Sequence, residues 1–332
     1  LLAREAALER AVALGAERST PGYLGAQNAD MREAFRYLSR GRPRIQVFDS
    51  NQGLVLPPVG AQAVYLLTED GLGAASPARQ LLGEEMARTS PEQAGNLLFY
   101  LFSGGATAGA DWPSLGFVAP GIEVGGAQIP RRLQAGKTVE LAILGKVGKA
   151  PRPLILFAHL IDSQGKVWGG QDQGAHPGTW QDGDRVVSWL QLPVEVETPT
   201  GGYWLEVGVY ASGQPVRLPL ATPEGQPLGN AIRLGSIKVL SRAWPPPSPQ
   251  PQHPHGADFG SLIRFLGYDL QREGEQLRLR LYWMGLGKIE TDYTFFVHLA
   301  DESGGLVAQH DGPPQGGSYP TSLWDEGEFV TD

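Results

Sequence analysis

The chain has 332 residues, of which 41% are hydrophobic and 19% charged. This composition supports packed cores and is too apolar for a disordered chain. The net charge of −8 repels phosphate backbones and disfavours nucleic acid as a partner. The absence of cysteine excludes disulfides, thiol catalysis and Cys-ligated metal sites. The 45 glycines and 27 prolines favour many turns and short strands.

Residues 1–110 combine helix and strand patterns and predict a small α/β domain. A first helix is expected over residues 2–14, with Gly15 as its stop. A second begins with Asp30 as N-cap and Glu33 completing a capping box. Short strands are expected at 45–48, 54–56, 63–67 and 97–102, and a third helix at Ser76-Pro77.

Residues 115–243 have a different pattern, with short alternating or apolar strands separated by Gly, Pro, Asp or Asn. The strands are expected at 139–143, 154–161, 186–192, 203–210 and 232–240. Several short strands at this spacing predict an immunoglobulin-like β-sandwich. The expected fold is therefore mainly β and multidomain.

An internal repeat is the clearest signal in the chain. FAHLIDSQGKVWGGQD (157–172) is matched by FVHLADESGGLVAQHD (296–311). GKTVELAIL (136–144) parallels GEQLRLRLY (274–282) upstream, and WQDGDRVV (180–187) parallels WDEGEFVT (324–331) downstream. We therefore expect a second sandwich over 256–332, after a Pro-rich linker over 244–255.

The second copy is expected to be incomplete. The first copy continues past its WQDGD turn to Leu240, whereas the second stops at Asp332. A sandwich without those last strands would expose an open core and unpaired edges. Either the chain is a fragment, as Leu1 in place of Met also indicates, or another segment supplies the missing strands.

Four residues at equivalent repeat positions are candidates for glycan binding: His159, His298, Trp180 and Trp324. Each His lies two residues after a Phe, on the same face of a strand. Each Trp lies beside an acidic glycine turn, where an aromatic face and carboxylates together suit a sugar ring. The alternatives are a histidine satisfied by a hydrogen bond and tryptophans that pack in the core.

Other polar groups have simpler interpretations. Asp162–Gly165 and Asp301–Gly304 fit hairpin turns better than calcium sites. The pairs Asp182/Asp184 and Glu326/Glu328 fit a solvated rim better than glycosidase carboxylates. The glycine-rich stretch 104–112 fits a connector, and His253 and His255 fit the linker. No catalytic residue, metal or cofactor is expected.

The second copy, FVHLADESGGLVAQHDGPPQGGSYPTSLWDEGEFVTD (296–332), resembles segments that follow the last membrane helix in bacterial polytopic glycosyltransferases of the protein-mannosyltransferase-like and aminoarabinose-transferase-like family. PTGGYWLEVGVY (199–210) and RIQVFDSNQGLVLPPVGAQAVYLLTED (44–70) are similar to other parts of that soluble region. The resemblance touches about two-thirds of the chain.

The resemblance implies a non-catalytic, extracytoplasmic region, periplasmic or at the cell surface, of an enzyme that uses a lipid-linked sugar donor. Its implied partners are the membrane-embedded helices of the same protein and a glycan or glycoprotein acceptor. No catalytic residue of the family can be placed on this chain. Two alternatives stay open: a secreted or surface-tethered glycan-binding or adhesion module, and a standalone enzyme with its site in the α/β domain.

Overall fold

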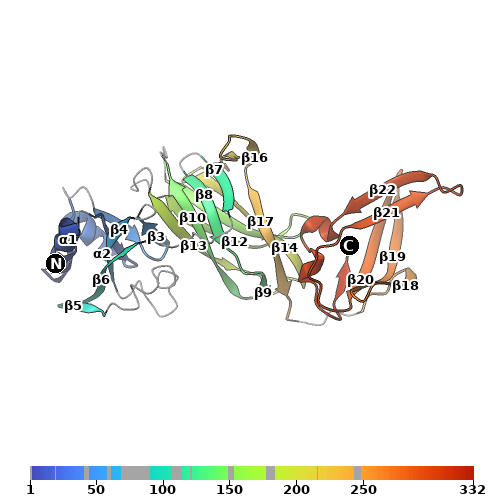
Figure 1. Cartoon of the computed structure of the whole chain (residues 1–332), viewed down its shortest axis with the longest axis horizontal. Helices are drawn as coiled ribbons and strands as arrows, with labels where there is room; N and C mark the ends of the chain where they lie inside the picture. The colour runs from blue at the N-terminus through green and yellow to red at the C-terminus, as the bar shows by residue number, and fades with distance from the viewer. Residues whose placement is uncertain are drawn as a thin grey trace.

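The computed structural model describes residues 2–18, 20–40, 45–57, 61–68, 90–105, 114–119, 122–148, 153–176, 184–214, 216–242 and 248–332. The fold is mainly β and multidomain. Figure 1 shows an N-terminal domain, a first sandwich and a second sandwich following one another along the long axis. Within these residues, no helix combines the length and the apolar character needed to cross a membrane. The expected third helix at Ser76-Pro77 and most of the 104–112 connector lie outside them.

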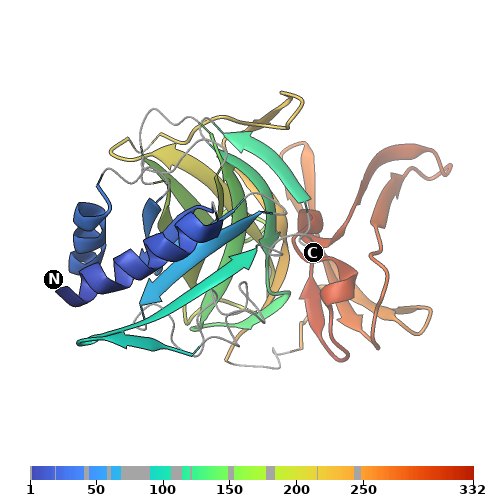
Figure 2. The same cartoon turned by 60° about the vertical axis from the view of Figure 1, so that its left-hand side comes forward.

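The N-terminal domain is a five-stranded sheet with two helices on one face (Figure 2). Its strands, in sheet order, are β2 (Ile45–Asp49), β1 (Gly22–Ala26), β4 (Gln62–Thr68), β6 (Leu97–Gly105) and β5 (Glu92–Ala94). The helices are α1 (Leu2–Arg18) and α2 (Ala29–Leu38). Their apolar faces, which include Leu8 and Phe35, pack on Leu24 and Leu66 of the sheet.

Two details of the helices differ from the sequence-based expectation. Helix α1 continues through Gly15 to Arg18, because a single glycine weakens a helix without ending it. The N-cap of α2 is Asn28, whose Oδ1 accepts a hydrogen bond from the Met31 amide at 3.0 Å. Asp30 instead lies in the first turn, where a carboxylate is favourable to the helix dipole.

The first sandwich has two sheets that enclose one apolar core. One sheet has the order β16 (Pro227–Gly229), β15 (Leu220–Ala221), β7 (Ser114–Ala119), β8 (Ile122–Gln128), β10 (Thr138–Val147), β13 (Arg185–Pro193) and β3 (Gly53–Leu56). The other has the order β12 (Val167–His176), β11 (Leu154–Ile161), β14 (Gly201–Ala211), β17 (Ile232–Leu240) and β9 (Arg132–Gln134). The Tyr203 hydroxyl, near the start of β14, donates to the Pro199 carbonyl at 2.7 Å. This is the tyrosine corner of immunoglobulin-like domains, in which β14 and β17 are the F and G strands.

Strand β3 joins the N-terminal domain to the first sandwich. Residues 53–56 pair antiparallel with β13 as an edge strand of the sandwich sheet, although they were expected to belong to the α/β domain. Tyr65 and Phe48 of the N-terminal sheet share a buried cluster with Val187 and Trp189 of the sandwich. The two domains therefore meet through a paired strand and a common core.

The second sandwich repeats the strand pairing of the first. Its strands are β18 (His253–Phe259), β19 (Ile263–Glu273), β20 (Gln276–Gly285) and β23 (Phe329–Thr331) in one sheet, and β21 (Phe295–Ala300) and β22 (Leu306–Gly312) in the other. Gly145 pairs with Val186 in the first copy, and Trp283 pairs with Val330 at the equivalent place. The bulge between β8 and β10 recurs between β19 and β20. The internal repeat is therefore a structural repeat.

The Pro-rich linker is shorter than expected at its C-terminal end. His253 and His255 lie in β18, and their rings contact the rings of Tyr268 and Phe265, respectively, on the neighbouring strand β19. The strand extends into the linker because the pairing with β19 begins at His253↔Tyr268. Residues 243–247 of the linker region lie outside the described part of the chain.

Candidate functional site

The first candidate, His159, lies with Phe157 on the outer face of β11. Their ring centroids are 5.0 Å apart, which confirms that the two side chains share a face. The Phe157 ring lies over Gly208 of β14, where an added Cβ would come within 2.4 Å of the Phe157 ring. Position 208 therefore requires glycine for the ring to lie flat on the sheet.

A polar network surrounds His159. Arg217 donates to Glu206 at 3.0 Å, places its Nη2 3.4 Å from His159 Nδ1, and stacks over the Phe157 ring at 4.3 Å. Burial, and then the charge of Arg217, lower the pKa of His159 below its ordinary value of 6.5, against smaller opposing effects of Glu206 and Asp172. His159 is therefore neutral at neutral pH, as a half-buried, hydrogen-bonded histidine.

The edge of this face carries a second polar pair. The Tyr210 hydroxyl donates to Asp172 Oδ2 at 2.7 Å, and this hydrogen bond is the main reason that the pKa of Tyr210 rises to about 12. The face can exchange hydrogen bonds with a polyhydroxylated ligand through Asp172, Glu206 and His159. Phe157 is only 2% exposed, so it has no free ring face for stacking on a sugar.

The equivalent pair in the second sandwich has the same geometry and a different environment. Phe296 and His298 also have ring centroids 5.0 Å apart, and His298 Nε2 lies 3.9 Å from Asp311 Oδ1. Phe296, however, is 72% exposed. The second copy therefore presents to solvent the ring that the first copy buries.

The two tryptophan candidates do not come together in a site. Trp324 is 2% exposed, packs in the core of the second sandwich, and donates from Nε1 to the Tyr319 carbonyl at 3.1 Å. Trp324 is therefore a core residue, and its indole N–H is already hydrogen-bonded within the protein. Trp180 lies in residues 177–183, outside the described part of the chain.

A buried ion-pair network joins the two sandwiches, and we call it the latch: Lys238, Asp325, Glu328 and Tyr319. Lys238, on β17 of the first sandwich, is fully buried. Its Nζ donates to the Leu323 carbonyl at 3.0 Å, to Asp325 Oδ2 at 2.7 Å and to Glu328 Oε2. Glu328 is 1% exposed and also accepts from the Tyr319 hydroxyl and from the Asp325 amide. The charges of the latch are thus both paired and hydrogen-bonded, as buried charges require.

Electrostatics and close packing reinforce the latch. Burial by itself raises the pKa of Asp325, but hydrogen bonds from Lys238 and Arg132 outweigh it and hold the pKa below its ordinary value. A Cβ on Gly202 would lie 2.2 Å from the Ser318 carbonyl oxygen, so only glycine lets the sandwiches approach this closely. Ser236 Oγ adds a hydrogen bond to the Gly317 carbonyl at 2.9 Å.

Sequence reasoning missed the latch. The prediction that Glu326 and Glu328 form a solvated rim is right for Glu326, which is exposed, and wrong for Glu328. Glu328 is buried because Lys238 reaches it from 90 residues earlier in the chain. The equivalent acid of the first copy, Asp184, accepts from Gln46 Nε2 of the N-terminal domain at 2.9 Å. The same repeat position therefore contacts the preceding domain in both copies.

The two aspartate turns have the predicted chemistry. Asp162 Oδ1 accepts from the Gln164 and Lys166 amides, and Asp301 Oδ1 accepts from the Ser303 and Gly305 amides, all at 2.8–2.9 Å. These oxygens hold backbone amides, as turn-forming aspartates do. Within the described residues, no group of three or more His, Asp or Glu could hold a metal ion.

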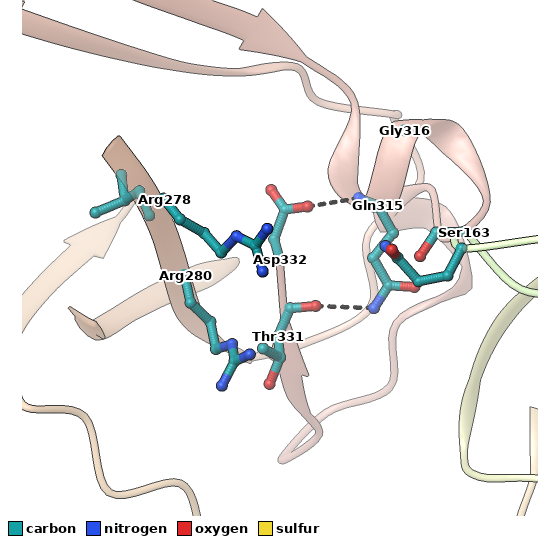
Figure 3. Close-up of a pocket in the computed structure, with 9 residues that line it drawn as sticks. Ser163, Arg278, Arg280, Gln315, Gly316, Thr331 and Asp332 are labelled. Atoms are coloured by element: carbon teal, nitrogen blue, oxygen red, sulfur yellow. Dashed lines mark hydrogen bonds between the residues drawn. The ribbon is translucent and has the colours of Figure 1, made fainter. Parts of the chain in front are cut away.

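A cavity of about 400 Å³ lies where the two sandwiches meet (Figure 3). Arg278 and Arg280 line one side, and Ser163 and Gln315 line the other. Two polar residues there already bond to protein: the Gln315 backbone N–H donates to Asp332 Oδ1 at 2.6 Å, and Arg278 pairs with Glu273 at 3.1 Å. We assign no ligand to this cavity.

The solved structures that are similar to this chain include distant likenesses. No family model and no curated protein matches the chain. A crystal structure of the C-terminal domain of wzt is 16% identical over 38% of this chain and 77% of that chain, with a TM-score of 0.28. The BSP domain of a biofilm associated protein is 10% identical over 63% of this chain and 24% of that chain, with a TM-score of 0.17. At these TM-scores neither likeness supports a functional assignment.

Proposed function

We propose that this chain is a non-catalytic, extracytoplasmic scaffold of a membrane glycosyltransferase that uses a lipid-linked sugar donor. In the full protein it braces the membrane-embedded helical portion or holds the glycan or glycoprotein acceptor at a set distance from it. The resemblance of residues 44–70, 199–210 and 296–332 to the soluble region of such enzymes supports the family.

The observation that carries the scaffold role is the continuous coupling of the three domains. Strand β3 joins the N-terminal domain to the first sandwich by strand pairing, and the latch joins the first sandwich to the second. A flexible array of binding modules would need neither connection, because a loose linker leaves each module free to reach its ligand. A brace needs both.

The first test is to read the coding sequence of the full protein. Several stretches of about 20 apolar residues encoded in the same reading frame would supply the membrane helices; a reading frame without them contradicts the proposal. In the full-length protein, Lys238→Met is then expected to lower glycosyl transfer, while Lys146→Met, at an exposed lysine, leaves it unchanged. Equal activity of the two variants would contradict the bracing role.

One observation favours the alternative, a secreted or surface-tethered glycan-binding or adhesion module. On the outer face of β11 and β14, Arg217 lies within hydrogen-bonding distance of both His159 and Glu206, with the Asp172–Tyr210 pair beside them. Such a cluster could exchange hydrogen bonds with sugar hydroxyls. A glycan array probed with the whole chain and with Arg217→Ala tests this function: glycan binding lost in the variant would support it, and binding to no glycan would contradict it.

A further inference from the structure

The latch brings one amine and two carboxyl groups into contact at a largely buried junction. Lys238 and Glu328 are both buried, and Lys238 Nζ lies 5.6 Å from the centre of the buried Tyr319 ring. The same Nζ lies 2.7 Å from Asp325 Oδ2, which is one covalent bond away from the carboxyl carbon. Buried charges carry a desolvation cost that pairing only partly offsets. A neutral amide in place of the Lys238–Asp325 pair would remove two of these charges.

Asp325 is held in the way that an acyl group under attack would be held. Its Oδ2 faces the amine of Lys238. Arg132 Nη1 lies 2.8 Å from its Oδ1 and also donates to its Oδ2 at 2.9 Å. A guanidinium at these oxygens stabilises the negative charge that develops when a nucleophile adds to the carboxyl carbon. The fixed contact of amine and carboxyl group also replaces a bimolecular encounter with an intramolecular one.

Glu328 is placed to move the protons of such a reaction. Its Oε2 accepts from Lys238 Nζ and from the backbone N–H of Asp325, so one oxygen touches both the amine and the acyl residue. Its Oε1 accepts from the Tyr319 hydroxyl, whose pKa is raised by burial and by the charge of Glu328. The tyrosine therefore keeps its proton, and Oε2 is the oxygen that can exchange a proton with Lys238.

We propose that Lys238 and Asp325 join through an amide bond between Nζ and Cγ, which crosslinks the two sandwiches covalently. The proposal does not depend on the membrane assignment. Lys238 passes one ammonium proton to Glu328, and the neutral amine attacks Asp325 Cγ. The C–N bond forms and the bond from Cγ to Oδ2 breaks. The proton held by Glu328 and a second amine proton leave with that oxygen as water. Ammonium and carboxylate thus give one amide and one water, with no further reactant.

The junction between the N-terminal domain and the first sandwich does not have this chemistry. There the repeat equivalent of Glu328 is Asp184, which accepts from the side-chain amide of Gln46. An amide nitrogen is not a nucleophile towards a carboxylate, whereas a lysine amine is. The crosslink is therefore specific to the junction of the two sandwiches.

Intact-mass spectrometry of the whole chain tests the crosslink. After incubation at neutral pH, we expect the denatured chain to be lighter than its sequence mass by one water molecule. A tryptic digest should then contain a branched peptide that joins residues 234–242 to the peptide beginning at Ile289, with the bond at Lys238 and Asp325. A chain that keeps its full sequence mass would overturn the proposal. So would loss of water without this branched peptide, because an aspartate can also lose water by cyclising onto its own backbone.

Two matched variants test the role of Glu328. Glu328→Gln removes the group that moves the proton and should slow crosslinking at least about 100-fold. Glu326→Gln makes the same change at an exposed neighbour and should crosslink like the parent chain. Equal rates in the two variants would overturn the proposed step. Asp325→Ala should keep its full sequence mass, and loss of water in that variant would place the bond elsewhere and overturn the proposal.

Discussion

The two sandwiches contain equivalent hairpins, β11–β12 in the first and β21–β22 in the second, and the two hairpins have different surroundings. Both copies form the aspartate turn, the same bulge and the same Phe–His contact at 5.0 Å. The first copy nevertheless buries its phenylalanine, and the second exposes it. Short-range sequence thus determines the geometry of the hairpin, through the turn and the strand register. Burial comes from β14, which pairs with β11, and from Arg217, which stacks over the Phe157 ring.

The second sandwich obtains part of its burial in another way. Its segment from Tyr319 to Trp324 packs in its own core, and the acids that follow bind Lys238 of the first sandwich. The outer face of β17 thus serves as a support for the next domain.

Lys238→Met should give the largest loss. It leaves Glu328 buried without its cation, and breaking a buried ion pair costs about 3–5 kcal/mol. The loss should appear in urea unfolding of the second sandwich, followed by hydrogen exchange of the backbone amides of β20 and β23. Lys146→Met is the control and should stay within about 0.5 kcal/mol of the parent chain. Equal stability of the two variants would mean that the latch does not hold the domains together.

Leucine truncation at one repeat position compares the two environments directly. Leu160→Ala removes a fully buried side chain and should cost about 2–5 kcal/mol in urea unfolding. Leu299→Ala removes its exposed equivalent and should cost less than about 0.5 kcal/mol. Similar losses at the two positions would refute the view that only the first hairpin is covered.

Alanine substitution of the two turn aspartates should destabilise the two hairpins by more similar amounts than the leucine truncations do. Asp162→Ala should cost about 1–3 kcal/mol, and Asp301→Ala should cost less. Asp162 holds two backbone amides and, through Oδ2, the Trp168 indole N–H at 2.9 Å, whereas Asp301 holds backbone amides and Ser303. Hydrogen exchange of each hairpin measures the effect. A larger loss at Asp301 would contradict the proposed order.

The smallest effect is a pH dependence at His159. Burial and Arg217 lower its folded-state pKa, so the unfolded chain binds the proton more tightly. This contribution to stability is complete at pH values above the unfolded pKa of about 6.5 and decreases as the pH falls below it. An NMR titration should give a pKa below 6.5 for His159, which Arg217→Ala should raise. A titration at or above 6.5 would contradict the network.

Much of the fold could be predicted from the sequence, since its signals are local. Alternating or apolar runs predicted β11 and β17 with the observed bounds, and the repeat predicted the second copy. The predicted N-cap of α2 was wrong because two nearby residues can both cap a helix. Asn28 and Asp30 are each suitable, and the helix begins after Asn28.

The latch could not be predicted, because its cause is not local. Ile237 and Val239 alternate with Lys238 in β17, a pattern that normally places a lysine in solvent. Its burial depends on Glu328, which lies 90 residues away. The pairing of β3 with β13 was missed for the same reason. The shared face of each Phe–His pair was predicted correctly, since the alternation of side chains along a strand is visible in the sequence.

The latch holds the two sandwiches in one orientation. The chain has no cysteine, so spin labels at Glu224→Cys and Glu275→Cys, both exposed, report on the two sandwiches without background. Double electron–electron resonance should give one narrow distance distribution, unchanged by Lys146→Met and broadened by Lys238→Met. A broad distribution in the parent chain, or a narrow one that survives Lys238→Met, would contradict the claim.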